Sequence, residues 1–327
     1  MNSDLFFVGK KAYYWGYIAP LVRAYSRLHG TAAPVLMLDS QRIADPPFTV
    51  PVNWKLVRTF KRTITFDVKA LFGAVLHGKR AIHVHHSLAG KGSAFKGTRP
   101  FLPFYLASSI VLPHKDRLSD IPASLRSKST SFGHIPFDWL GEYASEWPDQ
   151  FHGPLNRWRE AAGKSKALVA LLCTQGKFGA ISYFPEIVST KFDGCAIGVK
   201  LHGYIDRTEF RLEKETIDLE ECPTSIVCDL ADIVITDHCS AALEAHALGK
   251  VVFVYESDAL LWLMFKYPRL SELRYLEDVR FFQSPSELLP MIAEHLGKGD
   301  RGVGDLPDYH TQVSQQRASA RIIEWLS

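Results

Sequence analysis

The sequence lacks the features that would place the chain in a membrane or make its fold depend on disulfides. No uninterrupted apolar run reaches the roughly 18 residues that a transmembrane helix needs, because Lys, Arg, Asp or Pro breaks each candidate. The 327 residues contain only five cysteines, an odd number, with no Cys-x-x-Cys pair and no secretion signal ahead of them. We therefore expect a cytoplasmic protein with reduced thiols that does not cross a membrane.

Known nucleic-acid-binding motifs are also missing, although charge is unevenly distributed. Residues 1–150 hold 19 Lys and Arg against 10 Asp and Glu, and residues 151–327 hold 19 against 25, so the halves carry +9 and −6. A basic first half favours an anionic partner there, such as a phosphate-rich polymer or an anionic lipid surface. A solvated basic face without a partner is the alternative. Nucleic acid is not favoured, because no helix-turn-helix, zinc-finger spacing or RNA-binding sheet motif accompanies the charge.

Short apolar runs that alternate with helical periodicity predict an α/β chain of parallel sheets. The expected strands are Leu5–Gly9, Val35–Asp39, Ala81–His85, Ser109–Pro113, Ala167–Cys173, Ala196–Leu201, Ile233–Thr236 and Val251–Tyr255. They form two sets separated by a polar, Trp-rich connector at 142–166. We expect two doubly wound Rossmann-like domains facing across a cleft, at 1–150 and 151–311, with a helix in 312–327 that packs back on the first domain.

Histidines gather at the end of the expected strand 81–85, followed by a glycine-rich turn. His86 falls at the strand exit and is the candidate general base, because imidazole titrates near neutral pH. His83 and His85 share a face of the strand and are more readily explained as structural residues. We expect no metal site, because adjacent strand residues point apart and no acidic ligand lies near. Lys91 lies in a turn without the Gly-Lys-Ser/Thr of a phosphate loop, and we expect this turn to close over the site.

Two further segments place polar side chains after expected strands. In the turn 133–140, Asp138 either supports the site or caps the helix expected after it. His202 follows strand 196–201 beside Gly203, where it can donate to phosphate oxygens or serve as an ordinary structural histidine. Thr174 follows strand 167–173 and adds a weaker signal.

Residues 229–240 carry the most informative pattern, a short strand, a polar turn and then a helix from about 241 to 248 that Gly249 stops. The amides at the helix start, with the hydroxyls of Thr236 and Ser240, form an anion site that suits a pyrophosphate. Ordinary helix capping by Asp237 or Ser240 is the alternative.

These segments together resemble the CDP-glycerol glycerophosphotransferases of the teichoic-acid and capsule type. Residues 86–91 (His-Ser-Leu-Ala-Gly-Lys) resemble the family's His-Gly-Thr-Pro-Leu-Lys, and 133–140 resemble its Gly-Tyr-Pro-Arg-Asn-Asp-x-Leu turn. Residues 200–203 (Lys-Leu-His-Gly) resemble Arg-x-His-Pro, and 236–240 (Thr-Asp-His-Cys-Ser) resemble Thr-Asp-Tyr-Ser-Ser. The chain departs from the family where Gly-Thr-Pro becomes Ser-Leu-Ala and where Tyr-Ser becomes His-Cys.

The resemblance implies a two-domain fold of the GT-B type and a transferase that needs no cofactor and no metal. His86 would act as the base and His202 as a second catalytic residue, while an alditol phosphate moves from a CDP-linked donor to a hydroxyl. The first domain would serve the acceptor, an anionic polymer or a lipid-linked precursor, and the second the donor. A peripheral contact with the inner face of the cell membrane is a further expectation.

The expected donor-binding residues are Thr174, His202, Thr236, Asp237, Ser240 and Ala241, with Lys91, Asp138 and His238 in support. Two alternatives remain open at this point. The same fold could transfer a sugar from, or epimerise, a sugar nucleotide, or it could bind a phosphorylated polymer without turnover.

Overall fold

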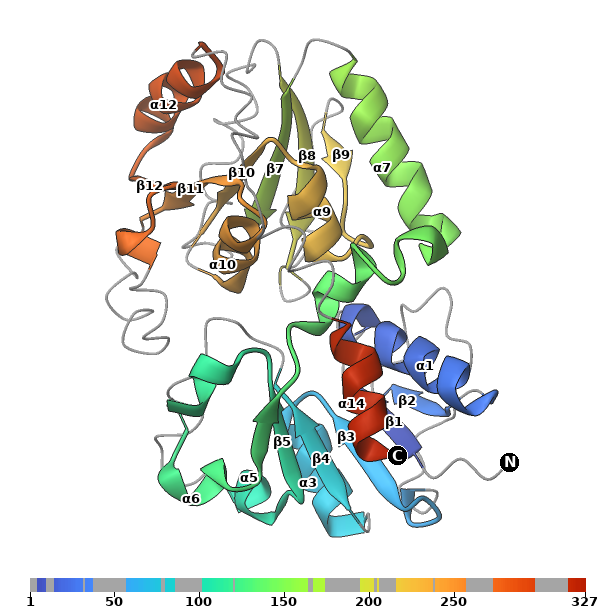
Figure 1. Cartoon of the computed structure of the whole chain (residues 1–327). Helices are drawn as coiled ribbons and strands as arrows, with labels where there is room; N and C mark the ends of the chain where they lie inside the picture. Colours follow the sequence, from blue (N-terminus) through green and yellow to red (C-terminus); the bar gives the residue numbers. More distant parts are fainter. Residues whose placement is uncertain are drawn as a thin grey trace. The chain divides into compact units, whose positions relative to one another are not determined.

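The computed structural model describes residues 5–9, 15–31, 33–37, 57–77, 80–85, 102–119, 121–163, 167–173, 195–202, 205, 216–237, 239–256, 273–297 and 317–327. The chain divides into two compact units (Figure 1). Unit 1 comprises residues 1–138 and 316–327, and unit 2 comprises residues 139–315. No described helix is both long and apolar enough to span a bilayer.

Unit 1 is built around a six-stranded parallel sheet with the order β2-β1-β3-β4-β5-β6. Its strands are β1 (Leu5–Gly9), β2 (Val35–Met37), β3 (Arg62–Thr65), β4 (Ala81–Val84), β5 (Ser109–Leu112) and β6 (Ser129–Ser131). Its helices are α1 (Trp15–His29), α3 (Val68–His77), α5 (Leu102–Leu106), α6 (Ala123–Arg126) and α14 (Ala318–Leu326), with 3-10 turns η2 (Lys115–Ser119) and η3 (Ile135–Trp139). Every pairing within the sheet is parallel, as a chain of βα units requires.

Helices α3, α5 and α6 form one core layer with β4 and β5. Leu71 of α3, Phe104 of α5 and Leu125 of α6 are each at most 1% exposed, and they pack against Ile110 and Leu112 of β5. The four residues of β4 and of β5 are all buried. A short strand that is apolar on both faces, covered by helices, therefore explains the continuous apolar runs in the sequence.

Helix α14 closes unit 1 by packing on α1. The buried carboxylate of Asp138 accepts hydrogen bonds from the backbone amides of Ala318, at 2.9 Å, and Ser319, at 2.7 Å. The hydroxyl of Ser319 also donates to this carboxylate. Asp138 therefore binds the first amides of a helix 180 and 181 residues later, and not those of the helix that follows it in sequence.

Unit 2 contains the second parallel sheet, with the order β12-β11-β10-β7-β8-β9. The strands are β7 (Ala167–Cys173), β8 (Cys195–Leu201), β9 (Ile217–Asp218), β10 (Ile233–Thr236), β11 (Val251–Tyr255) and β12 (Val279–Phe282). Its helices are α7 (Asp149–Ala162), α9 (Thr224–Leu230), α10 (Ser240–Ala247) and α12 (Pro285–Gly297), with the 3-10 turn η4 (Ala144–Glu146). Apolar side chains from β7, β8, β10, β11, β12 and α12 form its core.

Helix α7 lies against β8 at a glycine. A Cβ atom on Gly198 would lie 2.4 Å from Cδ1 of Leu219 and 2.8 Å from Cε2 of Trp158. The indole of Trp158 is fully buried, and its Nε1 donates to the carbonyl of Ala196 at 2.9 Å. Glycine at 198 therefore allows the large Trp158 ring to lie directly on the sheet.

The units meet in sequence at 138/139, whereas we expected the boundary near 150. The segment after Asp138 folds with unit 2, because the ring of Trp139 packs edge-on against Tyr143 and Phe151, with centroids 6.4 and 5.7 Å apart. Trp147 Nε1 also donates to the Trp139 carbonyl at 2.8 Å. The polar composition of this segment predicted a connector, whereas its aromatic side chains form a cluster that belongs to unit 2.

Candidate functional site

Parallel strands present ligand-binding residues at their carboxyl ends, so the edge of the unit 2 sheet where its strands end is the first place to look. His202 follows β8, Asp237 follows β10, Glu256 follows β11 and Gln283 follows β12. The strand order places β7 between β10 and β8. His202 and Asp237 therefore lie on the same edge, separated by one strand.

The loop between β10 and α10 is held from inside the sheet. Thr236 is fully buried, and its hydroxyl donates to the Leu172 carbonyl at 3.0 Å and lies 3.1 Å from the sulfur of Cys239. Asp237 is also buried, at 2% exposure. Because the Thr236 hydroxyl already donates to a carbonyl of the neighbouring strand, we assign Thr236 a role in positioning the loop and not in contacting a phosphate.

Helix α10 begins at this loop, with Ser240 and Ala241 as its first two residues. It ends before Gly249, whose φ of 68° is the left-handed conformation that glycine adopts most easily. The first amides of a helix have no carbonyl partner within the helix and carry partial positive charge. The start of α10 can therefore bind an anion at the carboxyl end of β10, with the half-buried Ser240 hydroxyl beside it.

Cysteine occupies the cap position of α10, where the resembled family has serine. Burial raises the pKa of the Cys239 thiol to about 12, and the nearby Asp237 adds to this effect. The thiol is therefore protonated at neutral pH and places no additional negative charge against an anion.

His202 is half-buried at the end of β8, and its carbonyl accepts a hydrogen bond from Ile205 N at 2.8 Å. Two residues earlier, Lys200 donates through Nζ to the Glu220 carbonyl at 2.6 Å. Burial lowers the pKa of Lys200, although nearby Cys222, Glu220, Asp218 and Glu244 oppose this shift. Lys200 therefore joins β8 to the turn after β9, while His202 remains at the edge of the sheet.

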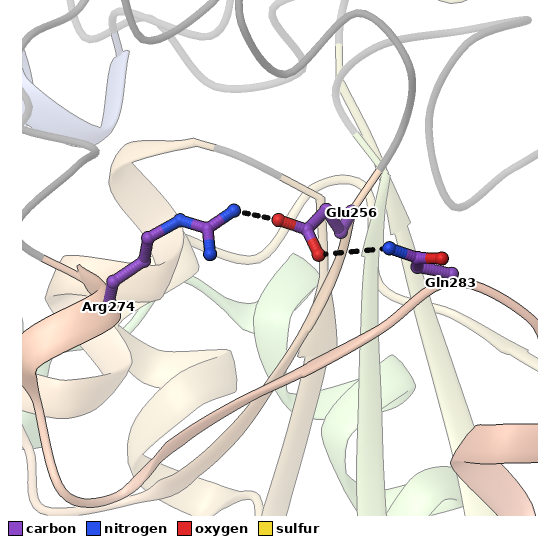
Figure 2. Close-up of polar contacts among 3 residues, drawn as sticks. All are labelled: Glu256, Arg274 and Gln283. Carbon is purple, nitrogen blue, oxygen red and sulfur yellow. Dashed lines mark hydrogen bonds and ion pairs between the residues drawn. The ribbon is translucent and has the colours of Figure 1, made fainter.

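A polar network that the sequence did not predict lies at the other end of the same edge (Figure 2). Glu256 accepts hydrogen bonds from the Arg274 guanidinium and from Gln283 Nε2, the latter at 3.3 Å. Arg274 also lies over the Phe281 ring, 5.2 Å from its centroid. The Arg274 side chain is 43% exposed and that of Glu256 is 18% exposed, so the network is accessible from solvent. No local motif could have shown it, because its members come from three separate segments.

The carboxyl edge of the unit 1 sheet carries a narrow pocket, without room for a water molecule, between β4, β5 and the turn after β6. His85, 6% exposed, and His134, 2% exposed, line it together with Tyr17 of α1. His134 meets Tyr17 edge-on, with ring centroids 5.9 Å apart. His83 lies one strand repeat before His85, with ring centroids 6.0 Å apart, and packs edge-on against Phe104.

The expected site residues therefore fall into three groups. Asp237, Ser240 and Ala241 lie together on the β10–α10 loop, and His202 lies on the same edge of the sheet. Asp138 instead accepts hydrogen bonds from the start of α14, within unit 1. His86, Lys91, Thr174 and His238 lie outside the described residues. Within the described part of the chain, no group of three or more His, Cys, Asp or Glu side chains could hold a metal ion.

Solved structures with the same fold include two kinds of nucleotide-using protein. The solved chain of the wall teichoic acid polymerase TagF is 13% identical, with a TM-score of 0.66 over 100% of this chain and 90% of that chain. A TagF histidine-to-asparagine variant soaked with CDPG is 14% identical, with a TM-score of 0.68 over 98% of this chain and 88% of that one. The UDP-GlcNAc 2-epimerase of Methanocaldococcus jannaschii, in complex with UDP-GlcNAc and UDP, is 12% identical, with a TM-score of 0.64 over 98% of this chain and 99% of the epimerase.

At these identities the likeness establishes the fold. The chain has a GT-B-like mixed α/β fold with parallel sheets, as the sequence predicted. No family model matches the sequence, and no curated protein matches it.

Proposed function

We propose that the chain is a transferase that moves glycerol phosphate, or another alditol phosphate, from a CDP-linked donor to a hydroxyl group. The acceptor would be a cell-surface polymer or its lipid-linked precursor, reached from the cytoplasmic side. TagF, a wall teichoic acid polymerase of the same fold, supports this choice, as does the order of the four motifs along the sequence.

The observation that carries the proposal is the unit 2 sheet edge, where the start of α10 and His202 follow strands β10 and β8, with only β7 between them. A diphosphate needs several hydrogen-bond donors close together, and this edge supplies helix amides, the Ser240 hydroxyl and an imidazole. Charged Glu256 and Arg274 lie beyond β11 on the same edge and are suited to polar groups elsewhere on the nucleotide.

In the proposed reaction, the acceptor hydroxyl attacks the β-phosphorus of the donor. A new oxygen–phosphorus bond forms, the bond from that phosphorus to the bridging oxygen breaks, and CMP leaves with the electron pair. His86 takes the hydroxyl proton, while His202, Ser240 and the amide of Ala241 stabilise charge on the diphosphate. Thr174, Lys91 and His238 remain proposed contacts on the donor side, with Thr236 and Asp237 shaping the loop.

A sugar-nucleotide reaction is the second candidate, and the epimerase of the same fold with bound UDP favours it. The two reactions differ in the bond that changes, because alditol-phosphate transfer releases CMP, whereas sugar transfer releases a nucleoside diphosphate. Epimerisation instead returns the whole sugar nucleotide with one carbon inverted. A protein that binds a phosphorylated polymer without turnover is the third candidate.

The purified full chain should be incubated with CDP-glycerol, CDP-ribitol or UDP-GlcNAc and a hydroxyl acceptor, and the nucleotide products separated by chromatography. The proposal predicts CMP from a CDP-alditol and no change in UDP-GlcNAc. Release of UDP, or an epimerised sugar nucleotide, would support the second candidate. If no donor turns over but a phosphopolymer binds His86→Ala and wild type alike, the third candidate stands.

Two histidine variants separate the proposed roles. His86→Ala should lower turnover by roughly 10²-fold or more while donor affinity stays near wild type, because only a proton acceptor is lost. His202→Ala should weaken donor binding as well, since its partner is present in the ground state. His152→Ala, an exposed histidine on α7, is the matched control and should change neither quantity. Full activity in folded His86→Ala would refute the base assignment, and His85 would be tested next.

A further inference from the structure

Exposed apolar side chains gather on two neighbouring helices of unit 1. Of the nine large apolar residues that are exposed in the described part of the chain, five lie on α3 and α5. They are Phe72 (47% exposed), Leu76 (57%), Leu102 (59%), Tyr105 (48%) and Leu106 (53%). We call these five residues the α3/α5 face.

The α3/α5 face follows helical spacing on both elements. Phe72 and Leu76 are four residues apart on α3, while Tyr105 and Leu106 are three and four residues after Leu102 on α5, so each helix turns one side outward. The opposite sides of both helices fill the unit 1 core, and the two helices contact each other (Figure 1). Each of the five half-exposed side chains contributes about 100 Å² of accessible apolar surface, so the face exposes roughly 500 Å². Apolar patches of this size are typical of binding surfaces for a protein or a membrane.

Basic side chains border this face at the ends of its helices. Lys128 donates to the carbonyls of Tyr105, at 2.6 Å, and Ala107, at 2.9 Å, just past the end of α5. Arg58 contacts Nδ1 of His77, the last residue of α3, at 3.4 Å. Lys61 and Arg80 are exposed, and Thr63 N bonds to the Arg80 carbonyl, which keeps these segments together beside the end of α3.

Negative charge is scarce in the segment that carries Arg58, Lys61 and Arg80. Residues 57–85 contain six Lys and Arg and one acidic residue, Asp67. The Asp67 carboxylate accepts a hydrogen bond from Ala70 N at 2.8 Å, so it lies at the start of α3, away from the basic helix ends. A partner for this surface therefore needs an apolar part and a negatively charged part.

We propose that the α3/α5 face and its basic border form a docking surface for an anionic lipid bilayer. The apolar side chains would enter the boundary between headgroups and acyl chains, while Arg58, Lys61, Arg80 and Lys128 would meet lipid phosphates. A second copy of this chain fits less well, because it would bring the same positive charges to the contact. The proposal does not depend on the transferase activity, since it rests on surface side chains away from the candidate site.

The basic border lies at the amino edge of the unit 1 sheet. Helices α3 and α5 end directly before β4 and β5 begin, whereas the pocket lined by His85 and His134 lies where β4 and β5 end. Docking on lipid through this face would therefore leave that pocket uncovered.

The test is co-sedimentation of the full chain with phosphatidylcholine vesicles, with or without phosphatidylglycerol. Wild type should bind the anionic vesicles, and salt should weaken the binding, because exposed charges are screened within about 8 Å at physiological ionic strength. The double variant Phe72→Ser, Leu76→Ser should reduce partitioning at least tenfold, and Arg80→Gln about fivefold. Leu28→Ser, a 49% exposed leucine on α1, is the matched control and should bind as wild type does.

Circular dichroism should show every variant folded, since the changed side chains are exposed. Equal binding to neutral and anionic vesicles, or wild-type binding by the double variant, would overturn the proposal. The proposal would also be overturned if light scattering showed that wild type is a dimer and the double variant a monomer, and neither bound lipid. Vesicle binding without turnover of any donor would leave this proposal standing and remove only the transferase proposal.

Discussion

The hydrogen bonds between Asp138 and α14 allow a quantitative test of how unit 1 is closed. Asp138→Ala removes a buried carboxylate that accepts bonds from Ala318 N, Ser319 N and the Ser319 hydroxyl. Loss of a helix cap costs about 0.5–2 kcal/mol, and buried donors left without an acceptor add about 1–3 kcal/mol. We therefore expect α14 to lose about 3 kcal/mol of its stability against local opening.

Hydrogen exchange of the α14 amides is the direct assay, because it reports this helix alone. A loss of about 3 kcal/mol corresponds to roughly 100-fold faster exchange, since each 1.4 kcal/mol is a factor of ten. Asp138→Asn keeps one acceptor oxygen, so its α14 exchange rate should lie between those of wild type and Asp138→Ala. Ser319→Ala should lower the stability of α14 by about 1 kcal/mol. The control is Asp149→Ala, an exposed aspartate in the first turn of α7, which should leave α14 unchanged. Wild-type exchange of α14 in folded Asp138→Ala would refute the reasoning.

Three further outcomes follow from packing and titration in unit 2. Gly198→Ala should destabilise unit 2 by about 1–3 kcal/mol in urea unfolding, because the new Cβ would overlap Leu219 and Trp158. An unchanged urea midpoint would mean that α7 can move away from β8 without loss of stability. Burial lowers the pKa of His246 below its usual 6.5, so as pH falls below about 6.5 the unfolded state binds the proton more readily and stability should fall. His246→Gln should flatten this part of the stability profile, and an identical slope would contradict it. The pKa of the Cys239 thiol is raised to about 12, so at pH 8 it should react with iodoacetamide at least 10³-fold more slowly in the folded protein than after unfolding. Fast labelling of Cys239 in the folded protein would contradict this, because it would show that the thiol is accessible and ionised.

The apolar strands of the sheets could be predicted from the sequence. Leu5–Gly9, Ala167–Cys173, Ile233–Thr236 and Val251–Tyr255 have the predicted bounds. Helix α10, predicted at about 241–248, is Ser240–Ala247 and ends two residues before Gly249. Residues 169–172, 233–236 and 252–255 are all buried, so the signal of these strands is a continuous apolar run that needs no knowledge of distant residues.

Four strands were missed, and three of them, β3, β6 and β9, lack that signal. The fourth, β12 (Val-Arg-Phe-Phe), has an apolar run interrupted by Arg280. β6 is Ser-Thr-Ser at a sheet edge, and β9 has two residues, so neither forms an apolar run. β3 begins with Arg62 and carries two threonines, which read as polar although Thr63 and Thr65 are buried. Backbone pairing with a neighbouring strand, and not side-chain hydrophobicity, defines these elements.

The candidate site was predictable only where its residues are close in sequence. The β10–α10 loop was predicted as one segment, and His202 was placed at a strand end. The partner of Asp138 lies 180 residues away, and the Glu256 network joins three segments, so spacing along the sequence could not indicate either. Thr236 was expected to contact phosphate because its hydroxyl is polar, but burial in the sheet directs that hydroxyl to Leu172.

The return of α14 to unit 1 has a consequence for the order in which the protein folds during synthesis. Unit 1 is made of two segments, residues 1–138 and 316–327, with all of unit 2 between them. The ribosome must therefore translate unit 2 before the helix that covers α1 exists, and until then the Asp138 carboxylate has no helix start to bind. Unit 2 can therefore reach its native state before unit 1 does. Until α14 is translated, an apolar side of α1 stays exposed, where it can bind chaperones or form non-native contacts.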